Sequence, residues 1–180
     1  MSESPECCWI CMGGQECGPM ERPCSCPRSV HMTCLGRWQL QSAGRSEESR
    51  CRFCSTLLPP LHATLTPSHL ANVEVTAYMA VVYGGVNHKI PVRPGIEGMA
   101  DFRARVKCLF GLPFESEFQV SFECAAPTSG EKLTLNGIGC FNAAAACAAI
   151  SAAKRAAGED SGFSWPENQQ QTQQQAGAIV

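Results

Sequence analysis

The pattern of apolar and polar positions changes along this 180-residue chain. The first third has no long amphipathic stretch, whereas the second half has apolar spacings typical of strands and helices. Residues 73–83 are rich in β-branched and aromatic side chains and predict a strand. Gly84-Gly85 predicts a turn, and residues 87–92 predict a second strand. We therefore expect a β-hairpin here.

The residues after this hairpin predict two helices and two further strands. Residues 96–110 carry apolar side chains at spacings of three and four, which indicates an amphipathic helix. Gly111 follows as its C-cap. Residues 117–123 alternate apolar with polar and predict a strand, and residues 132–135 predict a shorter one. The alanine-rich residues 138–157 predict a second helix, so the class is α+β with the order ββαββα.

That order resembles the ubiquitin-like β-grasp, including PB1 interaction domains. The resemblance implies that residues 72–157 form an interaction domain, for self-association or for recruiting a partner. Four scattered cysteines in the second half (Cys108, Cys124, Cys140 and Cys147) are expected to be small buried hydrophobes. Residues 158–180 are rich in glutamine, and we expect a disordered tail.

A proline-containing segment separates the two halves. Residues 58–67 read LPPLHATLTP and contain three prolines. Proline favours extended backbone, so this composition predicts a semi-rigid linker. We assign the linker to residues 62–71 and the preceding domain to residues 7–61.

Cysteine is concentrated at the N-terminus, where the first 54 residues hold nine of the 13. Seven of these nine, together with one histidine, form four closely spaced pairs: Cys8 and Cys11, Cys24 and Cys26, His31 and Cys34, Cys51 and Cys54. A spacing of one or two residues lets one short turn direct both side chains at a single ion. Zinc binds thiolate and imidazole in a tetrahedron, so four pairs provide ligands for two zinc ions.

The four pairs can be combined around two ions in two ways. If the first and third pairs share one ion and the second and fourth share the other, the two sites interleave in a cross-brace. If consecutive pairs combine, the finger is sequential, and the histidine pair then has no natural role. We favour the cross-brace. Cys7 and Cys17 are left over as free thiols, although Cys7 beside Cys8 keeps the choice between those two open.

Composition indicates which partners and which compartment to expect for this chain. The formal charge of −2 gives no reason to expect nucleic acid or an anionic membrane as a partner. The longest apolar run, residues 141–153, is too short for a transmembrane segment. The first residues, MSESPE, have no signal-peptide pattern. We therefore expect the cytoplasm or nucleus, where clustered thiols favour metal; the alternative is a disulfide-stapled secreted domain.

Two motifs within the paired cysteines carry a family resemblance. The tetrapeptide Cys8-Trp-Ile-Cys11 and the sequence Cys34-Leu-x-x-Trp38, in a C4HC3 ligand order, resemble the RING-CH (RING-variant) finger of E3 ubiquitin ligases. The resemblance implies a cross-braced fold with two zinc ions. It also implies docking of a ubiquitin-conjugating enzyme (E2) and transfer of ubiquitin to a lysine of a protein substrate, without a catalytic nucleophile.

The same resemblance suggests where an E2 would dock. A short helix over residues 32–42 would turn one tryptophan toward the first zinc loop. The second zinc loop contributes further apolar side chains. We expect these residues to form an exposed apolar groove between the two zinc loops. The predicted E2-binding residues are Ile10, Trp38, Phe53, Leu57 and Pro59.

Two departures from the family pattern support a different function. Only four residues separate Cys26 from His31, a gap nearer to that of PHD fingers. Ser55 follows the last ligand, where many active RING fingers have a basic residue. The alternative function is therefore a non-enzymatic binding module, either a PHD-like reader or a zinc-stabilised adaptor.

Overall fold

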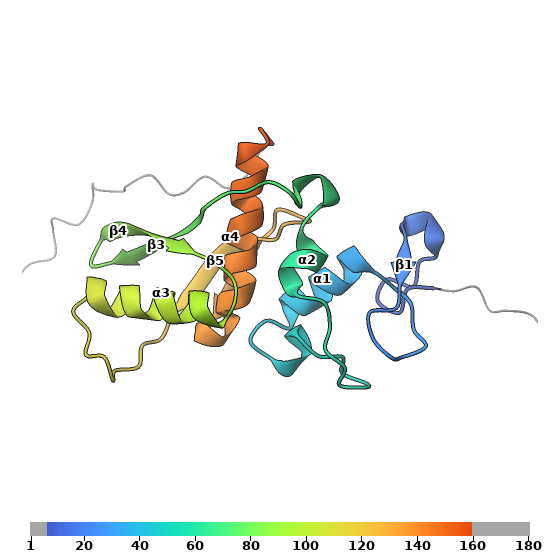
Figure 1. Cartoon of the computed structure of the whole chain (residues 1–180), viewed down its shortest axis with the longest axis horizontal. Helices are drawn as coiled ribbons and strands as arrows, with labels where there is room; N and C mark the ends of the chain where they lie inside the picture. The colour runs from blue at the N-terminus through green and yellow to red at the C-terminus, as the bar shows by residue number, and fades with distance from the viewer. Residues whose placement is uncertain (1–6, 160–180) are drawn as a thin grey trace, which may run out of the picture.

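The computed structural model describes residues 7–159, so the predicted Gln-rich tail lies outside the described residues from 160 onward. Within this range the molecule is elongated (Figure 1). The cysteine-rich segment lies at one end, and the predicted hairpin with its following helix lies at the other. Three helices, α1 (Met32–Gln41), α2 (Leu61–Leu65) and α4 (Phe141–Ala156), occupy the middle.

The cysteine-rich end contains little regular structure. Its elements are η1 (Gln15–Cys17), the paired strands β1 (Met20–Glu21) and β2 (Val30–His31), α1, and η2 (Ser46–Glu48). Helix α1 confirms the helix predicted over residues 32–42. The buried cluster here comprises only Cys8, Val30, Leu35, Cys51 and Leu58. A core this small leaves metal binding to supply most of the folding free energy.

The segment predicted as an extended linker is helical instead. Helix α2 begins directly after Pro60, and a 3-10 turn, η3 (Ser68–Leu70), follows Pro67. The prolines therefore flank the helical turns without interrupting them, because proline fits a helix start. Leu61, Leu65 and Leu70 are buried. Burial of these leucines outweighs the extended preference that the prolines suggested.

The packing of α2 joins the two halves of the chain. Leu40 of α1, Leu61 and Leu65 of α2, and Ile150 of α4 belong to one buried cluster. Gly36 allows the close approach of α1 and α2, because a Cβ there would lie 3.0 Å from the Thr64 carbonyl oxygen. The predicted boundary at residue 61 thus falls at the start of α2, a helix that packs against α1 of the first half and against α4 of the second.

A buried glutamine stabilises this junction. The Gln39 side chain is fully buried, and its amide nitrogen donates to the carbonyl oxygens of Glu48 and Pro59, both at 2.9 Å. Its amide oxygen accepts a 2.7 Å bond from the Thr64 hydroxyl. One side chain therefore satisfies three polar groups from separate segments.

Replacing Gln39 by leucine should destabilise the protein by about 2 kcal/mol, because two partly buried carbonyl oxygens and the buried Thr64 hydroxyl lose their partner. Urea denaturation of the zinc-loaded protein measures this loss. Gln41→Leu, at an exposed position of the same helix, is the matched control and should change stability little. Equal effects of the two changes would contradict the role of the buried network.

The second half has the predicted order of elements. Its elements are β3 (Ala77–Tyr83), β4 (Val86–Val92), α3 (Ile96–Leu109), β5 (Ser121–Ala125), β6 (Lys132–Asn136), η4 (Ile138–Cys140) and α4. The turn at Gly84 and Gly85 has φ of 55° and 79°, as a tight hairpin turn requires. Two strands begin four residues later than predicted, since only from Ala77 and Ser121 does each find a pairing partner.

The two hairpins form separate two-stranded sheets, β3-β4 and β5-β6. Helix α4 contacts β3 and β5 and so connects them. The rings of Phe102, Phe122 and Phe141 meet in the core at centroid distances of 5.2 to 6.3 Å. The resemblance to a β-grasp therefore extends to the order of the elements, while the strands do not join in one sheet.

Burial of the four later cysteines follows the prediction only in part. Cys140 and Cys147 are buried and Cys124 is half-buried, but Cys108 is exposed. The buried face of α3 is set by Phe102 and Val106, which are four residues apart. Cys108 lies two residues beyond Val106 and therefore points away from that face.

Candidate metal centre

The eight predicted ligands form two groups in space. Cys8, Cys11, His31 and Cys34 make one group, and Cys24, Cys26, Cys51 and Cys54 make the other. Within each group the ligand atoms lie within 4.8 Å of one another. The first and third pairs have combined, as have the second and fourth. This confirms the interleaved arrangement and excludes the sequential one.

The two terminal Cys-x2-Cys loops have the same backbone geometry. In the first loop, the Cys8 amide donates to the Gly13 carbonyl and the Met12 amide donates to the Cys8 carbonyl, both at 2.8 Å. In the second loop, Cys51 and Ser55 make the corresponding bonds at 2.9 Å. The repeated geometry follows from the repeated spacing and directs both sulfurs of each loop to one side.

Each loop ends at a residue whose backbone dihedral angles lie in the left-handed region. Met12 has φ of 61° and Ser55 has φ of 57°, and each directly follows the second cysteine of its loop. This conformation is uncommon for a residue other than glycine. Its recurrence at equivalent positions indicates that the loop shape is imposed by convergence of the thiols on one point.

The orientation of the histidine is set by a backbone contact. His31 Nε2 lies 3.0 Å from the Gly14 carbonyl oxygen, which can only accept, so Nε2 carries the proton. Nδ1 is then free to bind metal, and it lies 3.4 Å from Cys11 Sγ and 3.7 Å from Cys34 Sγ. A hydrogen bond of this kind commonly orients a metal-binding histidine.

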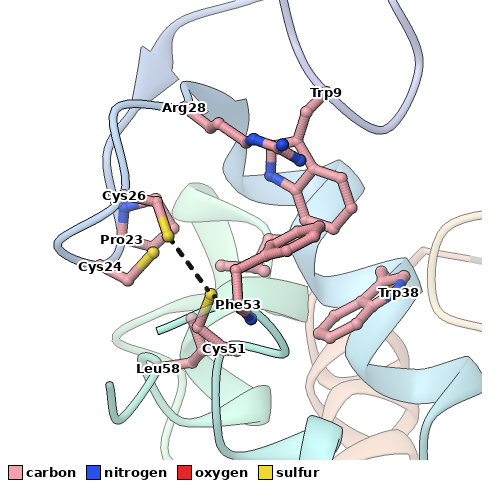
Figure 2. Close-up of a pocket in the computed structure, with 10 residues that line it drawn as sticks. Trp9, Pro23, Cys24, Cys26, Arg28, Trp38, Cys51, Phe53 and Leu58 are labelled. Atoms are coloured by element: carbon pink, nitrogen blue, oxygen red, sulfur yellow. Dashed lines mark hydrogen bonds between the residues drawn. The ribbon is translucent and has the colours of Figure 1, made fainter. Parts of the chain in front are cut away.

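Both groups fit zinc by composition and by spacing. A tetrahedral site with Zn–S bonds near 2.3 Å places its sulfurs about 3.8 Å apart. Cys26 Sγ and Cys51 Sγ are 3.9 Å apart (Figure 2). Four ligands per group leave no open coordination position, so the zinc would be structural. The two groups can therefore hold two zinc ions.

The thiols differ in how readily they ionise. Burial opposes ionisation of Cys8, but backbone N–H donors of Cys11 and neighbouring residues outweigh it and lower its pKa to about 6. The Thr56 hydroxyl and amide lower the pKa of Cys54 to about 6. Burial raises the pKa of Cys34 to about 12, and the neighbouring Cys54 thiol raises that of Cys26 to about 12. Burial also raises the pKa of Cys24, so the first group contains one thiol with a lowered pKa and one with a raised pKa, and the second contains one lowered and two raised.

Zinc loading should therefore release protons and weaken as the pH falls. Zinc binds cysteine as the thiolate, so at neutral pH it must displace the protons that the thiols of the metal-free finger carry. As the pH falls, protons compete more strongly for the seven thiols and for His31, so the affinity should fall. Competition with a chromophoric chelator between about pH 5 and 8 measures the slope; a pH-independent affinity would contradict thiolate ligation.

An aromatic groove lies beside the second metal group (Figure 2). The Trp9 ring packs edge-on against Trp38 at 5.7 Å and against Phe53 at 5.9 Å. The Arg28 guanidinium carbon lies 4.2 Å from the centre of the Phe53 ring. Phe53 is 51% exposed despite these contacts. The groove thus presents an aromatic surface with a positive rim.

The five predicted E2-binding residues are not all at this groove. Trp38 and Phe53 line it, whereas Ile10, Leu57 and Pro59 do not. Ile10 packs against the small finger core. Leu57 is 65% exposed, and Pro59 is half-buried near Gln39. The structure brings together one residue from α1 and one from the second zinc loop.

Trp9 and Arg28 are among the groove residues that were not predicted from the sequence. Trp9 stands between the first two ligands, inside the tetrapeptide that carried the family resemblance, so its position was the available signal. Arg28 has no comparable motif. It lies in the chain between Cys26 and His31, and its side chain reaches the Phe53 ring (Figure 2).

Comparison with known proteins agrees with this geometry. A family model described as the RING-variant domain matches residues 8–54. No curated protein and no solved structure matches the chain. Within residues 7–159, no helix has the length and hydropathy needed to cross a membrane. The matched segment begins at the first ligand and ends at the last, and residues 8–54 are therefore a RING-variant zinc finger.

Proposed function

We propose that this protein is an E3 ubiquitin ligase, or a subunit of one, whose finger docks an E2. RING-variant fingers are typical of such ligases. The observation that carries the proposal is the aromatic surface of Trp9, Trp38 and Phe53, which joins the two zinc loops. Aromatic side chains that are partly exposed beside an arginine are characteristic of protein-binding hot spots.

The proposed chemistry needs no nucleophile from the finger. A lysine amine of the substrate attacks the thioester that joins ubiquitin to the E2 cysteine. An isopeptide bond forms, the thioester breaks, and the cysteine leaves as a thiol. The finger contributes by holding the E2 in one orientation, which is a proximity effect. Because the zinc-binding thiols must stay reduced, the proposal places the chain in a reducing compartment such as the cytoplasm or nucleus.

The charge around the groove supports an acidic partner surface. Arg28 lies over one side of the Phe53 ring, and the Arg52 guanidinium carbon is 5.5 Å from the ring centre. Two cations beside one exposed ring favour carboxylates on the docked protein. We infer that the E2 surface seated here carries acidic residues around an apolar contact.

A reaction containing E1, a panel of E2s and ubiquitin tests the proposal. Phe53→Ala should reduce ubiquitin transfer at least about tenfold, because a half-exposed anchor is lost while the zinc groups stay intact. Phe114→Ala is the matched control, since Phe114 is 79% exposed and lies outside the finger. Zinc content should stay equal in both variants and in the wild type.

The same reaction separates the ligase from a non-enzymatic adaptor. Ser55 supplies no positive charge after the last ligand, which is the observation that favours the adaptor. If no E2 supports transfer while the zinc-loaded protein remains folded, the adaptor is the correct function. If transfer occurs but Phe53→Ala and Phe114→Ala behave alike, the groove is not the E2 site.

A further inference from the structure

A second groove, far from the finger, lies between the two hairpins. Its volume is about 550 Å³. Every residue from Tyr78 to Tyr83 lines it on one side, and every residue from Phe118 to Ala125 lines it on the other. A strand that presented only its face would contribute alternate residues, because successive side chains point to opposite faces. The unbroken runs show that β3 and β5 border the groove with their edges.

These two edges have unpaired backbone groups. β3 is hydrogen-bonded only to β4, and β5 only to β6, within residues 7–159. In an antiparallel pair, half of the N–H and C=O groups of each strand point away from the partner. Donors and acceptors therefore line both sides of the groove, and an extended peptide would satisfy both sets.

Two helices close the groove with apolar and small side chains. Helix α3 contributes Phe102 and Val106, one turn apart, and its C-cap residue Phe110 follows one turn later. Helix α4 contributes a stripe of small side chains that includes Ala144, Ala148 and Ser151.

The charged residues that line the groove indicate which extended peptides would bind best. Glu123 is paired with Lys132 at 2.9 Å. Arg155, at the end of the α4 stripe, is exposed and has no ion pair among the residues that the structure describes. The groove therefore has one uncompensated positive charge at that end, which favours a carboxylate on the occupant.

We propose that this groove binds an extended, acidic-ended peptide of another protein, which inserts as a strand between β3 and β5. Strand addition of this kind gains affinity from main-chain hydrogen bonds and specificity from alternate side chains. With five residues in β5 and seven in β3, the bound segment would have about five to seven residues. Its apolar side chains would alternate and face α3 and α4. The proposal is independent of ubiquitin transfer by the finger.

The test uses the full-length, zinc-loaded chain and the fluorescent peptide TVTVTVE. Binding is followed by fluorescence polarisation. Two further peptides are N-methylated, one at the three valines and one at the three threonines. Because alternate N–H groups of a strand point to opposite sides, each set removes the hydrogen bonds that the peptide donates to one edge. Insertion between two strands predicts that both sets weaken binding at least about tenfold.

Charge reversal tests the acidic end. Arg155→Glu should weaken binding of TVTVTVE about fivefold, and a peptide ending in lysine amide should regain it. Arg105→Glu is the matched control, because Arg105 is exposed on α3 and does not line the groove. If Arg155→Glu and Arg105→Glu weakened peptide binding equally, the acidic end of the peptide would not lie at Arg155.

Other outcomes would overturn the proposal itself. Absence of binding up to about 1 mM peptide would do so. An effect of only one N-methylated peptide would show addition to a single edge. The last check is hydrogen exchange, in the peptide-free protein, of those β3 and β5 amides that point away from β4 and β6. Protection that is already present would assign the groove to another part of this chain, and protection that rises with protein concentration would assign it to a second copy.

Discussion

Cys34→Ser is expected to reduce bound zinc from two ions per chain to one or fewer and to unfold the finger. The small finger core includes two of the ligands themselves, Cys8 and Cys51, so packing cannot replace the lost metal. A structural zinc site contributes on the order of 10 kcal/mol to folding. Because the two ligand groups interleave, loss of one ion should also loosen the other.

Native mass spectrometry counts the zinc, and amide NMR spectra report the fold of residues 8–58. Cys17→Ser is the matched control, because Cys17 is exposed and belongs to neither ligand group. It should keep two zinc ions and an unchanged spectrum. Cys7→Ser should behave in the same way, since the structure places Cys8 in the site. Two zinc ions retained by Cys34→Ser would contradict the assigned ligands.

Phe141→Ala is expected to lower the free energy of unfolding of the second half by about 3–5 kcal/mol. Phe141 is completely buried at the start of α4. Its ring lies 5.2 Å from that of Phe102 and 6.3 Å from that of Phe122, so it joins α3 and β5 to α4. Truncation would leave a cavity where these elements meet, and rigid neighbours fill such a cavity only partly.

Urea denaturation followed by near-UV circular dichroism measures this effect. The slope of the unfolding free energy against urea should stay constant if the change acts on stability alone. Phe114→Ala removes the same side chain from a 79% exposed position and should change stability by less than about 0.5 kcal/mol. Similar losses in both variants would mean that the aromatic cluster does not hold the second half together.

The metal centre was predictable because ligation depends on local spacing. A pair such as Cys51 and Cys54 is brought together by one turn, whatever the rest of the chain does. The cross-brace was also predictable, since the sequential alternative left the His31 pair without a role. The turn at Gly84-Gly85 and the helix capped by Gly111 were located for the same reason, because each depends on residues adjacent in sequence.

The errors occurred where burial depends on distant residues. The prolines of residues 58–67 suggested extended backbone, but Leu61 and Leu65 gain more by packing against α1 and α4 as a helix. Cys108 has the composition of a core residue and yet lies on the exposed side of α3. In both cases the decisive contacts come from segments far away in sequence, which no local pattern contains.

The sequence by itself determined the eight zinc ligands and the order of strands and helices in the second half, because these follow from short-range spacing and periodicity. It also favoured the interleaved pairing, because the sequential one left the His31 pair without a role. Only the tertiary structure decided that Trp9 and Arg28 join Trp38 and Phe53 in one groove. It alone also decided that the two hairpins stay apart and leave two strand edges facing each other. The physical reason is that such surfaces arise from long-range packing, which depends on the positions of all the elements at once.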